Sequence, residues 1–307
     1  MQSWYGIDIG GTKIELVAFD AAWQARHRQR VATPAQDYAA FLEAVDALVR
    51  DADTALGAPA TAVGIALPGV VERDGGRLLS ANVPALTGRR VHDDLRQRLQ
   101  RPLQFGNDLQ CFALSEANGG AAAGQASMLG VILGTGTGGG YCIDGRLVAG
   151  RNGIAGEWGH WSIPAHLLAR HALPLLDCPC GLRGCMERYV SGGGVSMLHR
   201  HAGGDDIDAA AIIARAQQGD RVARRALDMH GDLLGHGLAC LVMAVDPHVI
   251  VLGGGLSKAG HLYRDLPAAV ARHLFTGVAV PPILLPVFGD AGGARGAALL
   301  AHQAIRP

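Results

Sequence analysis

The chain has 307 residues and a formal net charge of zero, with 27 Lys and Arg residues against 27 Asp and Glu residues. This length favours two domains. The balanced charge, without a long run of one sign, argues against nucleic acid or an anionic membrane as the main partner. No stretch is apolar for long enough to span a membrane, and the start of the chain lacks the basic segment and apolar core of a signal peptide. We therefore expect a cytoplasmic protein.

The chain opens with a predicted β-hairpin. Residues 4–9 form its first strand, Gly10-Gly11-Thr12-Lys13 a tight turn, and residues 14–20 the returning strand. Backbone N–H groups in such a turn can form a nest for an anion, and Thr12 and Lys13 add donors. A strand rather than a helix follows, so the turn is neither a Walker loop nor a Rossmann fingerprint. An ordinary hairpin turn is the alternative.

Two loops that follow predicted strands carry polar side chains. A buried strand over residues 62–67 leads to a loop in which Asn82 could face a ligand, although a solvated asparagine is the alternative. A short strand over residues 103–105 leads to Asn107-Asp108, and apolar residues at helical spacing follow. Asp108 thus lies at a helix N-terminus, which favours a carboxylate. A simple helix cap and a catalytic carboxylate both remain open here.

A second glycine-rich turn repeats the opening plan. The apolar strand of residues 128–133 ends in Gly134-Thr135-Gly136-Thr137-Gly138-Gly139-Gly140, and a strand returns over residues 141–143. Asp144-Gly145 then suits a two-residue hairpin turn. Two such turns about half a chain apart predict two related domains that face one another across a cleft, with a phosphate-binding loop in each.

The next segment carries a dense set of metal-ligand residues. Gly156-Glu157-Trp158-Gly159-His160 is followed by Cys178-Pro179-Cys180-Gly181-Leu182-Arg183-Gly184-Cys185-Met186-Glu187. Three cysteines and one histidine are a common tetrahedral set for structural zinc, and Gly181 and Gly184 allow the tight turns that bring the thiolates together. Glu157 and Glu187 would project beside the metal. A loop with free thiols or a disulfide is the alternative.

The C-terminal part alternates helices and strands. Gly253-Gly254-Gly255 follows a predicted strand and leaves room for a flat ligand such as a purine. The closing helix is rich in small residues, which can pack closely on a neighbour. The other cysteines, in apolar settings, are interpreted as buried small hydrophobes: Cys111, Cys142 and Cys240. Further helices are predicted at residues 36–55, 209–216 and 220–245 and from about residue 258. Further strands are predicted at residues 248–252 and 283–287.

Together these motifs resemble the ROK family of sugar kinases over essentially the whole chain. The glycine-threonine turns resemble that family's phosphate loops, and the segment with His160 and the three cysteines resembles its signature and zinc site. Within the family the likeness is to kinases that act on N-acetyl-D-glucosamine, through residues 81–85, 107–117 and 289–298. Leu109 and Gln110 depart from the alanine and asparagine usual in the family; we expect both to point away from the sugar.

The resemblance implies an α/β, two-domain, actin-like (ribonuclease H-like) fold with a cleft between the domains. The small α/β domain would span residues 1–118 and be rejoined by a C-terminal helix over residues 291–307. The large α/β domain, with the zinc site, would span residues 119–290. A homodimer is also implied, although the sequence itself carries no signal for it.

The implied activity is ATP-dependent phosphorylation of the C6 hydroxyl of N-acetyl-D-glucosamine, giving N-acetylglucosamine 6-phosphate, with Mg-ATP as donor and a structural zinc ion. Asp108 would be the catalytic base. The other implied sugar ligands are Asn82, Asn107, Glu157, His160 and Glu187. The implied nucleotide-binding residues are Asp8, which orients hydrated Mg²⁺, and Gly10, Gly11, Thr12, Lys13, Thr135, Gly136, Gly253, Gly254 and Gly255. The implied zinc ligands are His160, Cys178, Cys180 and Cys185.

Other functions are weighed against this one. Some ROK proteins are sugar-responsive repressors, but they carry an N-terminal DNA-binding domain, and here the first phosphate loop already starts at Asp8. A zinc hydrolase needs a metal position open to water, whereas Cys3His is a closed set. Kinases of glucose, fructose or N-acetylmannosamine are the closer rivals. We further expect the zinc ion not to touch the nucleotide, whose loops lie elsewhere in the chain.

Overall fold

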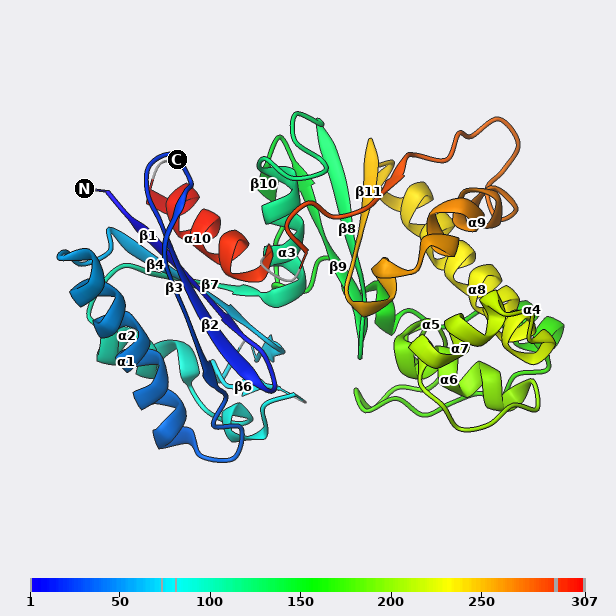
Figure 1. Ribbon diagram of the computed structural model, residues 1–307, viewed down its shortest axis with the longest axis horizontal. Coiled ribbons are helices and arrows are strands. Elements are labelled where there is room, and N and C mark those ends of the chain that lie inside the picture. Colours follow the sequence, from blue (N-terminus) through cyan, green and yellow to red (C-terminus); the bar gives the residue numbers. More distant parts are fainter. Residues whose placement is uncertain (1, 73, 81, 290–291, 306–307) are drawn as a thin grey trace. The chain divides into compact units, whose positions relative to one another are not determined.

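A computed structural model describes residues 2–72, 74–80, 82–289 and 292–305, and the chain divides into two compact units (Figure 1). The first unit comprises residues 1–119, 140–155 and 290–307, and the second comprises residues 120–139 and 156–289. Residues 140–155 are thus grouped with the first unit, whereas the resemblance implies that they belong to the large domain. The implied boundaries stay a prediction. The expectations that fall on residues 1, 81, 290, 291, 306 and 307 lie outside the described residues.

The first unit is built on a five-stranded mixed sheet in the order β3-β2-β1-β4-β7. The strand β1 pairs antiparallel with β2 and parallel with β4, which pairs parallel with β7. A small two-stranded sheet joins β5 and β6. The strands are β1 (Trp4–Ile9), β2 (Lys13–Phe19), β3 (Ala25–Ala32), β4 (Ala62–Leu67), β5 (Val70–Val71), β6 (Leu78–Leu79) and β7 (Leu103–Asn107).

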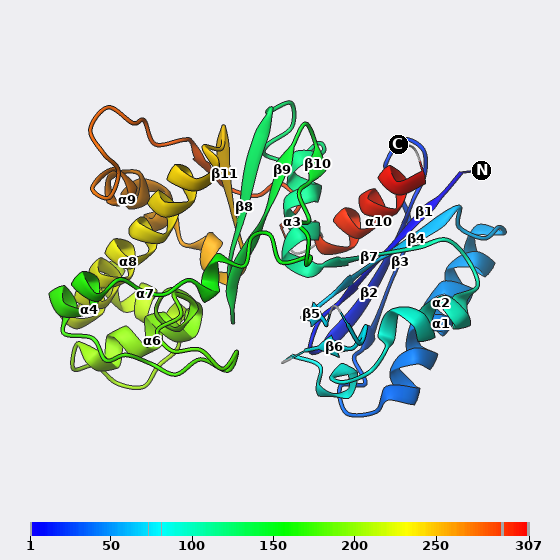
Figure 2. The ribbon, with the colours of Figure 1, turned by 180° about the vertical axis from the view of Figure 1, so that it is seen from behind.

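Helices cover both faces of this sheet, as Figures 1 and 2 show. On one face, α1 and α2 pack on the sheet through a core of aliphatic side chains and Phe41. On the other, alanines of α10 pack against Trp4 and Val17. Asp37 caps the start of α1, and Gly57, with φ of 69°, ends it. The helices are α1 (Tyr38–Leu56), α2 (Val91–Leu99), α3 (Asp108–Ala117) and α10 (Gly292–Ile305), with a 3₁₀ turn η1 (Pro84–Leu86).

The closing helix α10 lies directly on the sheet backbone, as its small residues predict. A Cβ atom on Gly6 would lie 1.7 Å from the carbonyl oxygen of Ala294, and one on Gly64 would lie 1.7 Å from that of Ala297. Both positions therefore require glycine, because no side-chain atom fits there. This contact fixes α10 over β1 and β4 and brings its N-terminus to the end of β1.

The second sheet has the order β10-β9-β8-β11-β12, with β8, β11 and β12 parallel. As predicted, a strand, a glycine-threonine turn and an adjacent strand recur here. The predicted hairpin turn is confirmed, since Asp144 and Gly145 have φ of 48° and 71°. The strands are β8 (Ser127–Leu133), β9 (Thr137–Ile143), β10 (Arg146–Leu147), β11 (Val249–Gly253) and β12 (Ile283–Leu284).

The long helix α8 (Arg221–Val245) is the core helix of the second unit. Its N-terminus is capped by Asp220, and it ends at Asp246 before a proline. The fully buried Trp158 packs against Gly237 on this helix, where a Cβ would lie 2.9 Å from the indole ring. The other helical segments are η2 (Trp158–His160), α4 (Ala165–His171), α5 (Glu187–Val190), α6 (Gly192–His201), α7 (Ala209–Gln217), η3 (Gly255–Lys258) and α9 (Gly260–Ala271).

Several elements have no counterpart in the sequence prediction. The strand β3 alternates between exposed and half-buried positions and is mostly polar, so it carries little apolar signal. The helices α2, α4, α5 and α6 are short and were also missed. The last strand stops at Leu284 rather than at residue 287, because Leu285 and Val287 are largely exposed.

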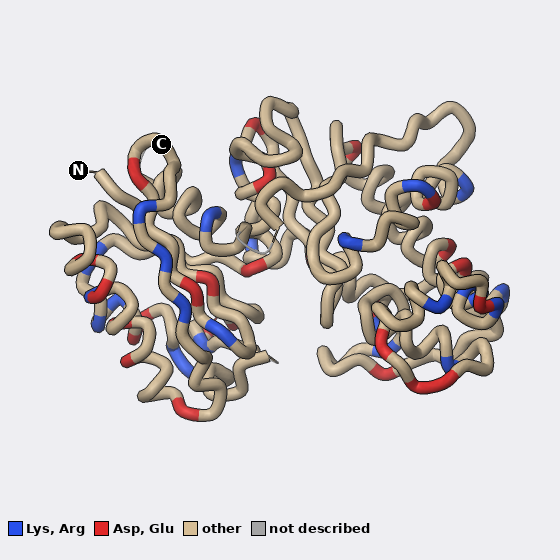
Figure 3. Tube along the Cα trace, viewed as in Figure 1, with Lys and Arg blue, Asp and Glu red and all other residues tan. Residues whose placement is uncertain are grey.

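Charged side chains of both signs are dispersed over each unit (Figure 3). On β2 and β3 they pair: Arg28 and Arg30 both contact the buried Glu15. Among the described residues, no helix is long and apolar enough to cross a membrane.

Candidate active site and metal site

The first glycine turn joins β1 to β2 as predicted. The N–H of Gly10 donates to the carbonyl of Lys13 at 2.9 Å, and the Thr33 hydroxyl donates to the carbonyl of Gly10 at 2.7 Å. Gly11 lies so close to the loop of Asn82 that a Cβ would be 3.0 Å from the Asn82 carbonyl oxygen. The turn and the asparagine predicted to face the sugar are therefore neighbours within one unit.

Two half-buried carboxylates of the first unit lie at the ends of β1 and β7, the two parallel strands that flank β4. Asp8 is near the end of β1, and Asp108 begins α3 directly after β7. Burial raises the pKa of Asp108 to about 6, against the opposing effect of the Leu109 N–H. Burial, together with the negative charges of Asp108 and Glu15, raises the pKa of Asp8 to about 7. The two carboxylates are thus electrostatically coupled, which sequence reasoning did not foresee.

The carboxylate of Asp8 also faces the start of α10. A Cβ on Gly293 would lie 2.3 Å from Oδ2 of Asp8, so only a glycine leaves space for the carboxylate there. Helix N-termini favour a neighbouring negative charge. The glycines at the start of α10 therefore serve both close packing and the placement of Asp8.

Asn107 is the residue that caps α3. Its Oδ1 accepts from the N–H of Leu109 at 2.9 Å, and its Nδ2 donates to the carbonyl of Gly69 at 3.3 Å. Oδ1 of Asp108 also accepts from Leu109, at 3.0 Å. Because Asn107 already provides the cap, the half-buried carboxylate of Asp108 is not required for that purpose. The unusual Gln110 is buried and donates to the carbonyls of residues 153 and 155.

The four predicted metal ligands converge in the second unit. One ligand atom from each of His160, Cys178, Cys180 and Cys185 lies within 4.8 Å of all the others. Nδ1 of His160 is 3.9 Å from Sγ of Cys178, and the sulfurs of Cys180 and Cys185 are 3.6 Å apart. Three thiols and an imidazole at these separations fit a tetrahedral metal ion such as zinc. The set can therefore hold a metal ion.

The loop that carries the cysteines turns where the sequence predicts. Gly181 and Gly184 have φ of 90° and 73°, which favour glycine. Two isolated bridges hold the loop, one between Ser162 and Cys185 and one between Asp177 and Arg183. The predicted role of both glycines in the tight turns is confirmed.

The two ring nitrogens of His160 face different groups. Nδ1 faces the thiols, whereas Nε2 lies 3.8 Å from Oε2 of Glu157. A metal bound through Nδ1 would fix the ring and leave Nε2 as a donor. This geometry supports the expectation that the histidine has one nitrogen for the metal and one for a ligand.

Glu187 makes a contact that sequence reasoning did not foresee. Its Oε2 accepts from the backbone N–H of Thr137 at 2.9 Å, in the second glycine-threonine turn. The same segment approaches this turn at Gly159, where a Cβ would lie 1.9 Å from the Thr137 carbonyl oxygen. Part of the segment that carries the cysteines thus contacts the second proposed nucleotide loop, although the expectation that the metal itself does not touch the nucleotide stays a prediction. Sequence distance concealed the contact, because the two segments meet only through the tertiary fold.

The third glycine cluster begins with Gly253, the last residue of β11, and continues through Gly255, the first residue of η3. Gly254 has φ of 77°, and a Cβ there would lie 2.6 Å from the carbonyl oxygen of Leu133. A Cβ on Gly255 would meet no atom within 4 Å, so the space beside it is open. These two facts agree with a turn that lets a flat ligand lie against the backbone.

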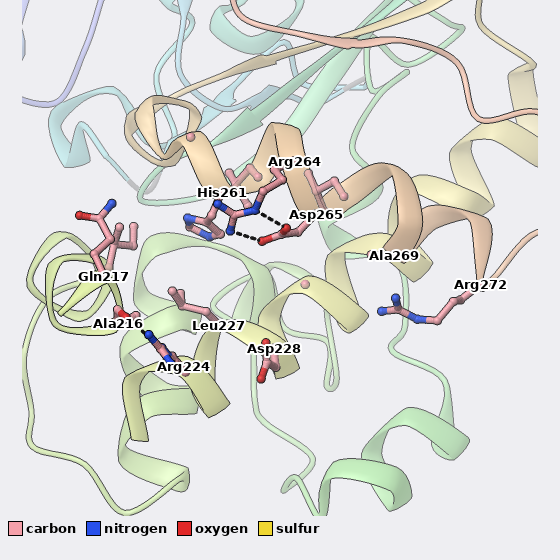
Figure 4. Close-up of a pocket in the computed structure, with 15 residues that line it drawn as sticks. Ala216, Gln217, Arg224, Leu227, Asp228, His261, Arg264, Asp265, Ala269 and Arg272 are labelled. Carbon is pink, nitrogen blue, oxygen red and sulfur yellow. Dashed lines mark hydrogen bonds and ion pairs between the residues drawn. The ribbon is translucent and has the colours of Figure 1, made fainter. Parts of the chain in front are cut away.

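Beyond η3, the helices α7, α8 and α9 enclose a groove of about 900 Å³ in the second unit (Figure 4). Figure 4 shows His261 and the ion-paired Arg264 and Asp265 on α9 opposite Leu227 and Asp228 on α8. The residues that line it include none of those predicted from the sequence to bind substrate. The groove is mixed in polarity and begins close in the chain to the third glycine cluster.

Sequence reasoning also missed a polar hub on α8. Asp232 accepts from Nε2 of His171 at 2.8 Å, Nε2 of His273 at 3.0 Å and Arg170 at 3.1 Å. Burial works to raise the pKa of Asp232, but these hydrogen bonds lower it to about 2. The hub ties α4 and the end of α9 to α8. No local pattern marks it, because the three elements are far apart in the chain.

The predicted site residues divide between the two units. Among the described residues, the first unit holds Asp8, Gly10, Gly11, Thr12, Lys13, Asn82, Asn107 and Asp108. The second unit holds Thr135, Gly136, Glu157, His160, Cys178, Cys180, Cys185, Glu187, Gly253, Gly254 and Gly255. Each unit therefore contributes one glycine-threonine turn and its own set of sugar-binding candidates.

Comparison with known proteins gives a family and near relatives. N-acetylgalactosamine kinase AgaK of Shewanella sp. (strain ANA-3) is 49% identical over 299 residues, which cover 97% of this chain and 96% of that protein. An N-acetyl-D-glucosamine kinase of Pectobacterium carotovorum subsp. carotovorum (strain PC1) is 44% identical over 299 residues, or 97% and 98% of the two chains. The crystal structure of a ROK hexokinase from Thermus thermophilus matches with a TM-score of 0.89 and 31% identity, over 99% of both chains.

These similarities agree with the motifs and with the sheet order. The fold class is the actin-like, ribonuclease H-like α/β class that the sequence led us to expect. The family model that matches residues 4–304 is that of the ROK family, and the chain belongs to this family.

Proposed function

We propose that this protein is an ATP-dependent kinase that phosphorylates the C6 hydroxyl of N-acetyl-D-glucosamine. The observation that carries the proposal is the pair of half-buried, interacting carboxylates Asp8 and Asp108 beside a glycine-threonine turn, in a chain of the ROK family. Relatives 41–44% identical over nearly the whole chain bear the name N-acetyl-D-glucosamine kinase, which supports this choice of sugar.

Asp108 is the catalytic base in this proposal. Its carboxylate accepts the proton of the C6 hydroxyl as that oxygen attacks the γ-phosphorus of ATP, and the β–γ bridging bond breaks to release ADP. Burial raises the pKa of Asp108 to about 6, which brings it nearer to working pH and makes the carboxylate a stronger base. The carboxylate is nevertheless ionised at neutral pH.

Asp8 orients the hydrated Mg²⁺ that accompanies ATP. In the ligand-free protein, burial and the neighbouring carboxylates raise the pKa of Asp8 to about 7. A nearby divalent cation favours the ionised form of the carboxylate. Backbone N–H groups of residues 10–13 and of Thr135 and Gly136 bind the phosphates, and Gly253 to Gly255 lie against the adenosine.

The sugar hydroxyls are bound by amides, carboxylates and one imidazole: Asn82, Asn107, Glu157, His160 and Glu187. Carboxylates accept and amides both donate and accept, so this set suits a polyol. Asn107 keeps its place through its cap and its bond to the Gly69 carbonyl. His160 presents Nε2 because Nδ1 faces the thiols.

One zinc ion per chain is bound by His160, Cys178, Cys180 and Cys185. The convergence of these four donors supports the proposal. A zinc ion held by four protein donors would have no position left for water, and it would fix the backbone from which Glu157 and Glu187 project. We further propose a cytoplasmic homodimer, in line with the family resemblance.

A second sugar deserves a direct test. The relative at 49% identity is named for N-acetylgalactosamine, which differs from N-acetylglucosamine only in configuration at C4. Both share the C2 acetamido group and the C6 hydroxyl on which the proposed chemistry depends. Glucose, fructose and N-acetylmannosamine are the remaining alternatives.

The deciding experiment is ADP release from Mg-ATP with each of these five sugars, followed by mass and ³¹P analysis of the product. We expect the highest kcat/KM with N-acetylglucosamine and a 6-phosphate product. A clear preference for N-acetylgalactosamine, glucose or fructose would overturn the choice of sugar but not the kinase. Absence of phosphorylated product with all five sugars would contradict the kinase proposal itself.

A further inference from the structure

The hydrogen bond between Glu187 and Thr137 joins a proposed sugar ligand to a proposed phosphate-binding turn. Glu187 is a sugar ligand in the function proposed above, and Thr137 lies in the glycine-threonine turn proposed to bind phosphate. The carboxylate Oε2 is 2.9 Å from the Thr137 nitrogen. A Cβ on Gly136 would lie only 2.7 Å from the same oxygen, so the carboxylate also lies against the turn.

This contact is held within the second unit alone. Glu187 begins α5 two residues after Cys185, whose neighbour Met186 donates its N–H to the carbonyl of Trp161 at 2.9 Å. The N–H of Gly192 donates to the carbonyl of Gly134 at 2.8 Å, which fixes the other end of α5 to the same turn. The carboxylate is therefore placed by the fold rather than by a flexible surface loop.

One side chain of this turn has a hydroxyl without a hydrogen-bond partner in the ligand-free protein. Oγ1 of Thr137 is buried and has no hydrogen-bond partner among the described residues. Its backbone N–H is already used by Glu187. A polar group that is buried without a partner costs free energy, and it is satisfied most simply when a ligand or a small rearrangement of the turn supplies one.

A carboxylate and a phosphate cannot both use the Thr137 N–H without mutual repulsion. Two negative charges a few ångströms apart repel each other, and the repulsion is stronger in a site partly removed from water. A sugar hydroxyl that donates to Glu187 shares the carboxylate with the Thr137 N–H, and it lowers the negative charge with which Oε2 holds this N–H. The sugar and the phosphates are therefore linked through Glu187.

We propose that Glu187 is a positioning residue that makes ATP binding depend on the sugar. Without sugar, the carboxylate holds the Thr137 N–H and opposes the phosphates. When sugar hydroxyls donate to Glu187, its carboxylate rotates away from the glycine-threonine turn. The backbone N–H of Thr137 is then free to bind a phosphate oxygen. The coupling is reciprocal, so ATP also raises the affinity for sugar. The arrangement favours sugar before ATP and limits hydrolysis of ATP by water.

The test is calorimetric titration of the zinc-containing, full-length protein with Mg-AMPPNP, an ATP analogue that is not hydrolysed. Titrations are made with and without the sugar that the panel shows to be phosphorylated. The variant Glu187→Gln keeps the shape of the side chain and removes its charge. The matched control is Glu157→Gln, the same change in a carboxylate that faces Nε2 of His160. Zinc content and melting temperature verify that each variant is folded.

In the wild-type protein we expect sugar to tighten AMPPNP binding about 5-fold or more, the usual range of such coupling. In Glu187→Gln we expect AMPPNP to bind about 10-fold more tightly without sugar, the scale of one charge-assisted hydrogen bond. Sugar should then add little further affinity for AMPPNP. Glu157→Gln should weaken sugar binding while its sugar-free AMPPNP affinity stays at the wild-type value.

A role limited to sugar binding would give a different result. If Glu187→Gln loses sugar affinity but binds AMPPNP without sugar as the wild type does, the proposal is overturned. The Glu187→Ala variant provides a second measurement, since it frees the N–H completely and should also bind AMPPNP more tightly. Failure of the kinase proposal is recognised separately, because the wild-type protein would then phosphorylate none of the sugars.

Discussion

Replacement of Asp108 by Asn should have opposite effects on activity and on stability. The amide keeps the shape of the side chain, and Asn107 continues to cap α3 through its bond to the Leu109 N–H. The base, however, is lost. We expect kcat to fall about 10²-fold or more, the scale of a missing general base, with little change in sugar affinity.

The effect on stability follows from the pKa. Burial raises the pKa of Asp108 from 3.8 to about 6 in the folded protein, so folding favours the protonated form. The ionised carboxylate therefore costs stability once the pH exceeds the unfolded value, and the full cost is reached above pH 6. A shift of about two pKa units corresponds to roughly 3 kcal/mol at most.

Asn does not ionise, so Asp108→Asn should unfold with a higher free energy than the wild type at pH 8. Loss of the negative charge also removes one of the causes that raise the pKa of Asp8, which adds to the gain. The gain should fall to less than about 1 kcal/mol at pH 4, where the folded carboxyl is protonated and the unfolded one, with a pKa of 3.8, is about half ionised.

The assays are steady-state ADP release and urea unfolding at pH 8 and pH 4. Asp206→Asn is the control, because this side chain is 78% exposed and should change neither quantity. Near-normal turnover in folded Asp108→Asn protein would show that Asp108 is not the base. If Asp108→Asn is no more stable than the wild type at pH 8, the argument that burial destabilises the ionised carboxylate is refuted.

Three further predictions follow from the second unit and from α10. Cys180→Ser, or chelation, should remove about one zinc per chain and weaken sugar binding. The affinity for AMPPNP should change as well, because Glu187 joins the metal segment to the second glycine-threonine turn. Metal analysis and calorimetry with each ligand test this, and unchanged sugar affinity in folded, metal-free protein would refute it. Gly64→Ala should destabilise the protein by more than about 3 kcal/mol, because its methyl group would overlap the Ala297 carbonyl; urea unfolding decides, and a loss under about 1 kcal/mol would show that α10 relaxes easily. Asp232→Asn should lower the free energy of unfolding by about 2 kcal/mol at pH 7, since the folded pKa of about 2 lies below the ordinary value. The difference in stability from the wild type should shrink as the pH falls from the ordinary pKa to the folded one. A difference that is the same at pH 7 and pH 2 would contradict this prediction.

The sequence by itself determined the parts of this protein that depend on residues close together in the chain. Cys178, Cys180 and Cys185 lie within eight positions, so their convergence needs only two tight turns, and Gly181 and Gly184 supply them. The strand–turn–strand plan is likewise local, because an apolar run followed by glycines marks it directly. These features, and the family, were correctly predicted for that reason.

Short or polar elements were beyond sequence reasoning. The strand β3 is mostly polar along its length and is held at the sheet edge by pairing with β2. Its amino-acid composition therefore does not indicate a strand. The helices α4, α5 and α6 are too short to show a clear period. Their positions are set by what they pack against, and that information lies elsewhere in the chain.

Only the tertiary structure decided how the functional groups meet. Asp8 and Asp108 are a hundred residues apart, and they share an electrostatic environment because β1, β4 and β7 are neighbours in one parallel run of the sheet. Glu187 reaches Thr137 because α5 docks on the second glycine turn. A sequence shows which side chains can donate, accept or ionise. Burial and distance, which set the pKa values and the competition for a single N–H, arise only when distant segments pack together.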